Sequence, residues 1–143
     1  VTLSNQEKEL YSLKKGDILI NRVNSEEYVG KCCMYDREDD TAVFESNIMR
    51  FRVNQELILP EYLTFYLSSS GGKEQILKKI KRAVNQVSVN QEDIKSIQIP
   101  LKDISEQRII VDSVNQNLQT ISDLESIRDS NINLIEKEIE NMY

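Results

Sequence analysis

Histidine is absent from this sequence of 143 residues. Without it, Ser-His-Asp and Cys-His catalysis are excluded, and so are His-based proton shuttles and most catalytic zinc sites. A zinc site here would have to use carboxylates only, which match zinc poorly. One missing residue type therefore removes much of the enzymology that a chain of this size can carry.

Cysteine is scarce as well, with only the adjacent pair Cys32 and Cys33. Adjacent cysteines rarely form a disulfide with each other, and the chain has no third cysteine as a partner. We therefore predict a reduced, cytoplasmic protein with at least one of the two thiols in the core. No apolar run is long enough for a transmembrane helix, so no membrane partner is expected, and the first residues lack a signal-peptide pattern.

Glycine and proline are also few, at four and two residues, while 39% of the residues are hydrophobic and 29% are charged. This composition is ordinary for a folded protein and argues against disorder. The length allows one domain, or one domain with an appended element. Within the net charge of −6, residues 101–143 hold four Lys or Arg against nine Asp or Glu, whereas residues 1–100 are almost neutral.

Residues 1–101 have the pattern of an α+β domain with a small mixed or antiparallel sheet and packed helices. Strands are predicted over 17–23, 28–35 and 42–53, which are rich in β-branched and aromatic residues. Gly30 is a candidate bulge in the second of these strands.

Two helices are predicted after the strands. Pro60 suits the first turn of one helix, and the serines and glycines at 68–72 end it. A second helix is expected over 73–84, with Val84 and other apolar residues directed toward the core. Its exposed face would carry five cations: Lys73, Lys78, Lys79, Lys81 and Arg82.

The stretch from Gln86 to Val111 contains boundary signals rather than catalytic residues. Asn90 is placed to cap a short helical turn, Pro100 to end a last strand, and Ser105 to cap a long helix. We interpret this stretch as a stiff junction between a compact body and a helix that leaves it.

Residues 102–143 predict a long coiled-coil helix, about 57 Å from residue 105 to residue 142 at roughly 1.5 Å per residue. Apolar residues recur at gaps of four and three, which is the signature of a helix-pairing seam. The seam is interrupted near Glu125 and Arg128, and a helix of this length needs a partner helix. The predicted seam residues are Val114, Leu118, Ile121, Ile132, Ile135, Ile139 and Met142.

Two short motifs resemble catalytic patterns but lack essential parts of them. The Gly-Gly-Lys at 71–73 has no earlier glycine as in a phosphate-binding loop, since Leu67 stands at that position. The Asp-Ile-Lys at 93–95 fits half of a nuclease pattern, yet it falls in the predicted helical turn. No catalytic residue, metal site or cofactor-binding loop is therefore predicted in this chain.

The basic face of the second predicted helix admits two interpretations. It can be a solvated surface, or it can contact DNA phosphates while neighbouring amides read adenine edges in the major groove. Near the end of the first predicted strand, Arg22 could contact guanine and Asn24 could contact adenine. The candidate DNA-binding residues are Arg22, Asn24, Ser25, Lys78, Lys79, Lys81, Arg82, Asn85 and Gln86.

Five segments, taken in order, resemble one known family. They are GDILINRVNSEEYVGK, FESNIMRFRVN, PEYLTFYLSSSGGKEQI, NQVSVNQEDIKSIQIPL and SEQRIIVDSVN, and they extend from about Leu13 to the end of the chain. Together they resemble the target recognition domain of type I restriction-modification specificity subunits. The most specific part is the Ile-Pro-Leu at 99–101, followed by the Ser-Glu-Gln at 105–107 that opens the long helix.

The resemblance implies a non-catalytic subunit that reads one half of a bipartite DNA site. In the complete subunit, two recognition domains are separated by two long antiparallel helices, and this subunit holds two methyltransferase subunits and directs ATP-driven restriction subunits. S-adenosylmethionine, ATP and Mg would be bound by those partners and not by this chain. The single recognition domain here implies a homodimer, or pairing with another specificity half, through the C-terminal helix.

The sequence departs from the family pattern in two places. The linker before the long helix is LKDIS rather than proline-rich, and a strand and loop expected before the Lys-Gly turn at 15–16 are missing. We therefore expect a fragment, a truncated product or one half of a split subunit. Two other functions stay open: a coiled-coil interaction protein that does not bind DNA, and the specificity region of a single-chain restriction-methylation enzyme.

Overall fold

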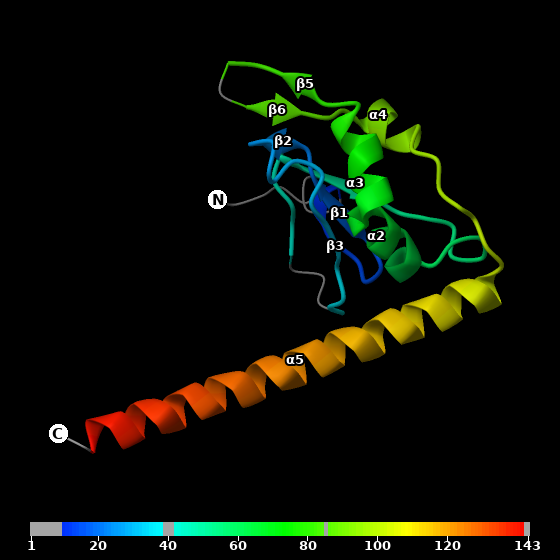
Figure 1. Ribbon diagram of the computed structural model, residues 1–143. Helices are drawn as coiled ribbons and strands as arrows, with labels where there is room; N and C mark the ends of the chain where they lie inside the picture. The colour runs from blue at the N-terminus through cyan, green and yellow to red at the C-terminus, as the bar shows by residue number, and fades with distance from the viewer. Residues whose placement is uncertain (1–9, 39–41, 85, 142–143) are drawn as a thin grey trace. The chain divides into compact units, whose positions relative to one another are not determined.

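The computed structural model describes residues 10–38, 42–84 and 86–141 (Figure 1). The chain divides into two compact units, residues 1–107 and 108–143. The first contains small antiparallel sheets and short helices, and the second is the continuation of one long helix. The predicted α+β class with a long C-terminal helix is therefore confirmed. In the described part of the chain, no helix combines the length and the apolar character needed to cross a membrane.

Strand β1 (Ile18–Asn21) is the centre of the first sheet. It lies between β3 (Cys32–Met34) and β4 (Ile48–Phe51), and both pairings are antiparallel. Ile18 and Ile20 are fully buried, because alternate residues of a strand point to the same face of a sheet. This face of β1 is the base on which the core of the first unit is built.

The second sheet has three strands of two residues each, in the order β2, β6, β5. They are β2 (Val23–Asn24), β5 (Lys81–Arg82) and β6 (Val87–Ser88), again antiparallel. Because β2 follows β1 after Arg22 alone, this residue joins the two sheets. Figure 1 shows β5 and β6 side by side as a hairpin next to β2.

Three short helices pack against the sheets: α2 (Pro60–Ser68), α3 (Ser70–Leu77) and α4 (Gln91–Lys95). The helix start predicted at Pro60 is confirmed. The cap predicted at Asn90 is confirmed too, because its side chain accepts a hydrogen bond from the backbone of Asp93 and the Asp93 side chain accepts one in return. The buried core cluster contains Ile18, Ile20, Val29, Met49, Leu63, Leu67, Ile76, Val87, Val89, Ile94 and Ile97.

The predicted helix over 73–84 is wrong in its second half. Helix α3 begins earlier than predicted, at Ser70 within the serines and glycines expected to separate the two helices, and it ends at Leu77. Lys81 and Arg82 form strand β5. Val84, expected in the core, is 97% exposed. Apolar residues spaced by four fit a helix, but they also fit a helix followed by a turn and a strand. Pairing with β6 outweighs the weak helix propensity of the segment, since tertiary contacts routinely override propensity.

Two predicted strands are shorter than expected. The strand over 28–35 begins only at Cys32, and Gly30 before it has a φ of +79°. This left-handed conformation places Gly30 in a turn and not in a bulge. The strand over 42–53 is reduced to the four residues of β4.

The last strand predicted before Pro100 is absent, and side chains hold this segment instead. The Gln98 N–H donates to Gln75 Oε1 at 3.0 Å, and its carbonyl accepts from Gln75 Nε2 and from the Tyr66 hydroxyl, both at 2.9 Å. The Tyr62 hydroxyl donates to the Pro100 carbonyl at 2.7 Å. Side chains of α2 and α3 therefore take the place of a neighbouring strand.

Helix α5 (Ile104–Glu140) begins before the residue that was predicted to cap it. Ser105 lies inside the first turn, while the Asp103 carbonyl already accepts a hydrogen bond from the Gln107 N–H at 2.9 Å. Aspartate is as suitable a capping residue as serine, so the sequence offered two equivalent starts two residues apart.

Gln107 is the last residue of the first unit and its side chain is completely buried. Its Oε1 accepts from the Leu59 N–H at 2.9 Å, and its Nε2 donates to the carbonyls of Leu57 at 2.9 Å and Lys102 at 2.7 Å. The amide thus connects the first turn of α5 to the loop before α2. This buried Gln107 side chain follows the LKDIS linker at 101–105, which lacks the prolines typical of the family.

Candidate nucleic-acid interface

The hairpin of β5 and β6 presents two different faces. Its register places Lys81 opposite Ser88 and Arg82 opposite Val87, and opposite residues of an antiparallel pair share a face. Val87 is buried, so Arg82 lies on the face turned toward the core, where it forms an ion pair with Glu26 at 2.9 Å. Lys81 and Ser88 lie on the other face.

Gln86 belongs to the same face as Lys81. The Ala83 N–H donates to the Gln86 carbonyl at 2.9 Å, which continues the pairing beyond the two strands. Since Gln86 precedes Val87 along the chain, its side chain points away from the core, and it is exposed. Among the described residues Lys81 has no ion-pair partner. We call Lys81, Gln86 and Ser88 the outer face of the hairpin; Asn85 lies outside the described residues.

Asn24 and Ser25 lie beside the hairpin, at the end of β2. Both are exposed, and Asn24 is opposite Val87 in the sheet. The Asn24 Oδ1 accepts from the Ser25 N–H at 2.8 Å, so its amide nitrogen is the group left for an outside partner. The Ser25 carbonyl accepts from the N–H groups of Tyr28 and Val29 in the turn that follows.

The other predicted cations do not join the hairpin in one basic face. Lys78 follows the end of α3 and forms an ion pair with Glu74 at 2.6 Å. This hydrogen bond and the charge of Lys78 lower the pKa of the Glu74 carboxyl. Lys79 is half-buried, and Lys73 lies within α3. Because the predicted helix is broken, its cations are divided between the end of α3 and the hairpin.

Arg22 has a fixed backbone and an unpaired side chain. Its N–H donates to the Asn47 carbonyl at 2.8 Å, and its carbonyl accepts from the Val89 N–H at 2.9 Å. Its Nε is buried, with no hydrogen-bond partner among the described residues, and the Asn21 Oδ1 is in the same condition. Such groups cost folding free energy, about 1–3 kcal/mol each, unless water or a ligand satisfies them.

Two adjacent hollows share Arg22 as a lining residue, together with Phe44 and Ile48. The larger, about 430 Å³, is completed by Tyr11, Val43 and Ser46. The smaller, about 290 Å³, is completed by Met49, Arg50 and Gln91. The sequence predicted Arg22 as a DNA-binding residue but gave no signal for Phe44, because it falls in a segment predicted as regular strand.

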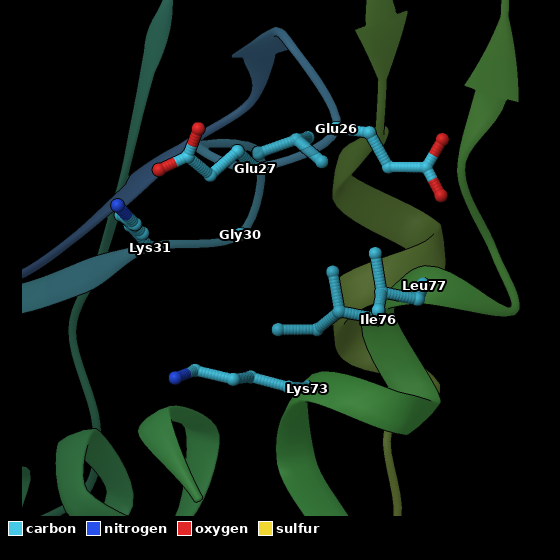
Figure 2. A pocket seen from close by; sticks show the side chains of 8 residues that line it. Glu26, Glu27, Gly30, Lys31, Lys73, Ile76 and Leu77 are labelled. Carbon is cyan, nitrogen blue, oxygen red and sulfur yellow. The ribbon is translucent and has the colours of Figure 1, made fainter. Parts of the chain in front are cut away.

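A third hollow, about 260 Å³, lies between α3 and the turn before β3 (Figure 2). Figure 2 shows Ile76 and Lys73 projecting from α3 on one side, with Gly30 and Lys31 across from them. Glu26 and Glu27 also line it. Glu26 is paired with Arg82 at 2.9 Å, so the lining charges without an ion-pair partner among the described residues are Glu27, Lys31 and Lys73.

Asp93 and Cys32 both have local partners in the structure. Asp93, which suggested half of a nuclease pattern, is committed to the cap of α4. Burial raises the pKa of the Cys32 thiol, whose Sγ lies 3.4 Å from the Ser68 Oγ, while Cys33 is exposed. Within the described ranges, no group of three or more His, Cys, Asp or Glu is placed to hold a metal ion.

The predicted seam of α5 is largely uncovered in this chain. Val114 is half-buried, and Met142 lies outside the described residues. The five others, each between 46% and 56% exposed, are Leu118, Ile121, Ile132, Ile135 and Ile139.

Comparison with known proteins gives a consistent result along nearly the whole chain. Residues 2–134 match the type I restriction modification DNA specificity domain. The chain is 37% identical over 131 residues to a protein named as the type I restriction enzyme MjaX specificity subunit of Methanocaldococcus jannaschii. The matched region covers 91% of this chain and 28% of that protein.

Two bacterial relatives show the same partial coverage. The StySPI specificity subunit of Salmonella potsdam is 29% identical over 81% of this chain, and the EcoKI specificity subunit of Escherichia coli is 30% identical over 79%. The chain spans about a quarter of the length of these relatives. It belongs to the family of type I restriction-modification DNA specificity domains.

Proposed function

We propose that this chain reads one half of a bipartite DNA site as the recognition module of a type I restriction-modification specificity subunit. The observation that carries the proposal is the outer face of the hairpin, where an unpaired cation, Lys81, lies on the same face as an exposed amide, Gln86. This chain belongs to a family of DNA specificity domains, which gives that surface its interpretation. A two-stranded β-ribbon fits the major groove of B-DNA. Lys81 would contact a phosphate and Gln86 the edge of an adenine.

The remaining polar groups around the hairpin would position the protein rather than read bases. Asn24 and Ser25 lie beside the hairpin, and Arg82, Lys78 and Lys79 are paired or partly buried. A cation that must first release a carboxylate gains less from a phosphate than an unpaired one does. We therefore assign the largest electrostatic contribution to Lys81.

Chemistry would be supplied by other chains. We propose that methyltransferase subunits bind S-adenosylmethionine, that restriction subunits use ATP and Mg, and that this chain directs both to the site. The exposed seam of α5 would pair with the helix of a second copy or of another specificity half. This arrangement provides the second recognition domain that a bipartite site requires.

The salt dependence of DNA binding tests the proposal. Each phosphate contact contributes about 0.9 to the slope of log affinity against log salt concentration, so Lys81→Ala should flatten this slope by about 0.9. Lys95→Ala is the matched control, because Lys95 is an exposed lysine on α4, paired with Glu92 at 3.0 Å. Equal slopes for Lys81→Ala and the unchanged protein would remove the hairpin from the interface. Absence of DNA binding would favour the coiled-coil interaction protein.

A further inference from the structure

The hollows around Arg22 are built differently from the hairpin. Phe44 forms their common wall, and its ring is fixed from two sides. The Tyr11 ring meets it edge-on, with ring centroids 5.6 Å apart, and the Arg50 guanidinium lies 5.2 Å from its centroid. Arg50 is itself held by the Ser12 carbonyl at 2.7 Å. The wall is therefore an ordered aromatic surface with a cation behind it.

Arg22 also lines these hollows, and its side chain has no hydrogen-bond or ion-pair partner among the described residues. Arg50 donates to backbone carbonyls and lies 3.9 Å from the Asp17 carboxylate, so its charge is partly offset. The Arg22 side chain, by contrast, makes no hydrogen bond or ion pair with any described residue. Turning toward an incoming acceptor would break no hydrogen bond or ion pair of Arg22 and would satisfy a donor that is buried without a partner.

The lining favours a planar, neutral acceptor over a phosphate. Tyr11, Val43, Phe44 and Ile48 make the walls of the larger hollow mostly apolar and aromatic, and a phosphate would lose hydration there with a single unpaired cation to compensate. A guanine edge carries two acceptors whose spacing matches the fork of a guanidinium. Ser46 and Gln91 line the two hollows and can bond the neighbouring base.

We propose that the hollow of Arg22 and Phe44 is a second base-recognition site, separate from the hairpin, which receives the edge of a guanine. The inference rests on the proposed DNA-reading function and adds the base, the residue that reads it and the aromatic wall that supports it. Phe44 acts as a positioning residue, because it would hold the base edge against Arg22 without a hydrogen bond of its own.

Single-atom changes in the DNA test this site. The preferred duplex is first selected from random sequences with the 143-residue chain, and each guanine is then replaced singly by 7-deazaguanine, which lacks one of the two acceptors. The unchanged protein should lose about fivefold or more in affinity at one guanine. Arg22→Gln should be insensitive to that replacement, whereas Lys81→Ala, with weaker overall binding, should keep the full sensitivity. Thermal unfolding of Arg22→Gln checks that its fold is intact.

The possible outcomes separate the two proposals. Loss of the 7-deazaguanine effect in Arg22→Gln alone supports the guanine site. An equal loss of affinity for all duplexes would make Arg22 a phosphate contact, and no loss would remove it from the interface; either result overturns the guanine site while DNA recognition by the hairpin stands. If the unchanged chain selects no sequence, the proposed function itself fails, and the guanine site fails with it.

Discussion

At the scale of single residues, the candidate cations differ in the contacts they would give up on binding DNA. Lys78 and Arg82 each hold a carboxylate in the free protein. Lys81 and Arg22 hold none among the described residues, so a DNA contact would break no ion pair at either side chain. An exposed ion pair stabilises the free protein by about 0–1 kcal/mol. Each paired cation would lose that amount before it could contact a phosphate. Affinity should therefore depend more on the two unpaired side chains than on the total number of lysines and arginines.

Gly30 supports the turn that carries Glu26, the partner of Arg82. Its φ of +79° is unfavourable for any other residue, and a Cβ at this position would lie 2.7 Å from Ile76 Cγ2. Ile76 is 1% exposed and cannot move aside. We expect Gly30→Ala to lower the free energy of unfolding by about 2–4 kcal/mol, from backbone strain and overpacking together. Urea unfolding followed by tyrosine fluorescence measures this, since the chain has no tryptophan.

Gly71 offers a matched control for that substitution. It lies near the start of α3, where a Cβ would meet only the Ser69 Oγ at 3.9 Å. Gly71→Ala should leave stability unchanged or raise it by about 0.5–1 kcal/mol, because alanine favours the helix. A Gly30→Ala variant as stable as Gly71→Ala would contradict the packing described for the turn.

At the scale of elements, local signals were sufficient for helices with clear boundaries. Pro60 predicts the start of α2 and Asn90 predicts the start of α4, and the regular apolar spacing predicts α5. The hairpin has no comparable signal: β5 and β6 are two residues long, and β5 forms only because β6 is beside it. The wall at Phe44 is also set by tertiary contacts, because the Tyr11 ring comes from a distant part of the sequence and the nearby Arg50 is held by the Ser12 carbonyl. The sequence therefore allowed the polar and basic candidates to be identified. It did not allow us to predict on which face of the fold each of them lies.

The start of α5 depends on one buried amide. Replacing Gln107 by leucine keeps most of the volume but leaves the Leu59 N–H and two carbonyls without their partner. We expect Gln107→Leu to lower the free energy of unfolding of the first unit by about 2–4 kcal/mol. The neighbouring Glu106→Gln removes only an exposed ion pair with Lys102 at 3.5 Å and one charge in the first turn, so it should lower this free energy by no more than about 1 kcal/mol. Equal stability of the two variants in urea would show that water satisfies the abandoned groups.

At the scale of the whole molecule, the two units differ in how much of their apolar surface they bury within this chain. The first buries a core of its own. The second is a helix whose apolar seam is about half exposed along its described length, and isolated helices are stabilised chiefly by packing of such a face. Residues 108–143 hold three Lys or Arg against seven Asp or Glu, and this acidic balance would repel DNA phosphates.

We expect the chain to form a dimer of 16.6 kDa subunits through this seam. Light scattering should give about twice the monomer mass at micromolar concentration, and Leu118→Lys with Ile135→Lys should reduce it to the monomer, because each pairing would bury a lysine at the seam. Ile109→Lys is the control: Ile109 is exposed on α5 but lies off the seam, so its variant should stay dimeric. A dimer would make a two-fold-related DNA site the working model, since each copy supplies one recognition unit. A monomer for the unchanged chain would contradict self-pairing and assign the seam to a different chain, whose own recognition unit would then define the other half of the site.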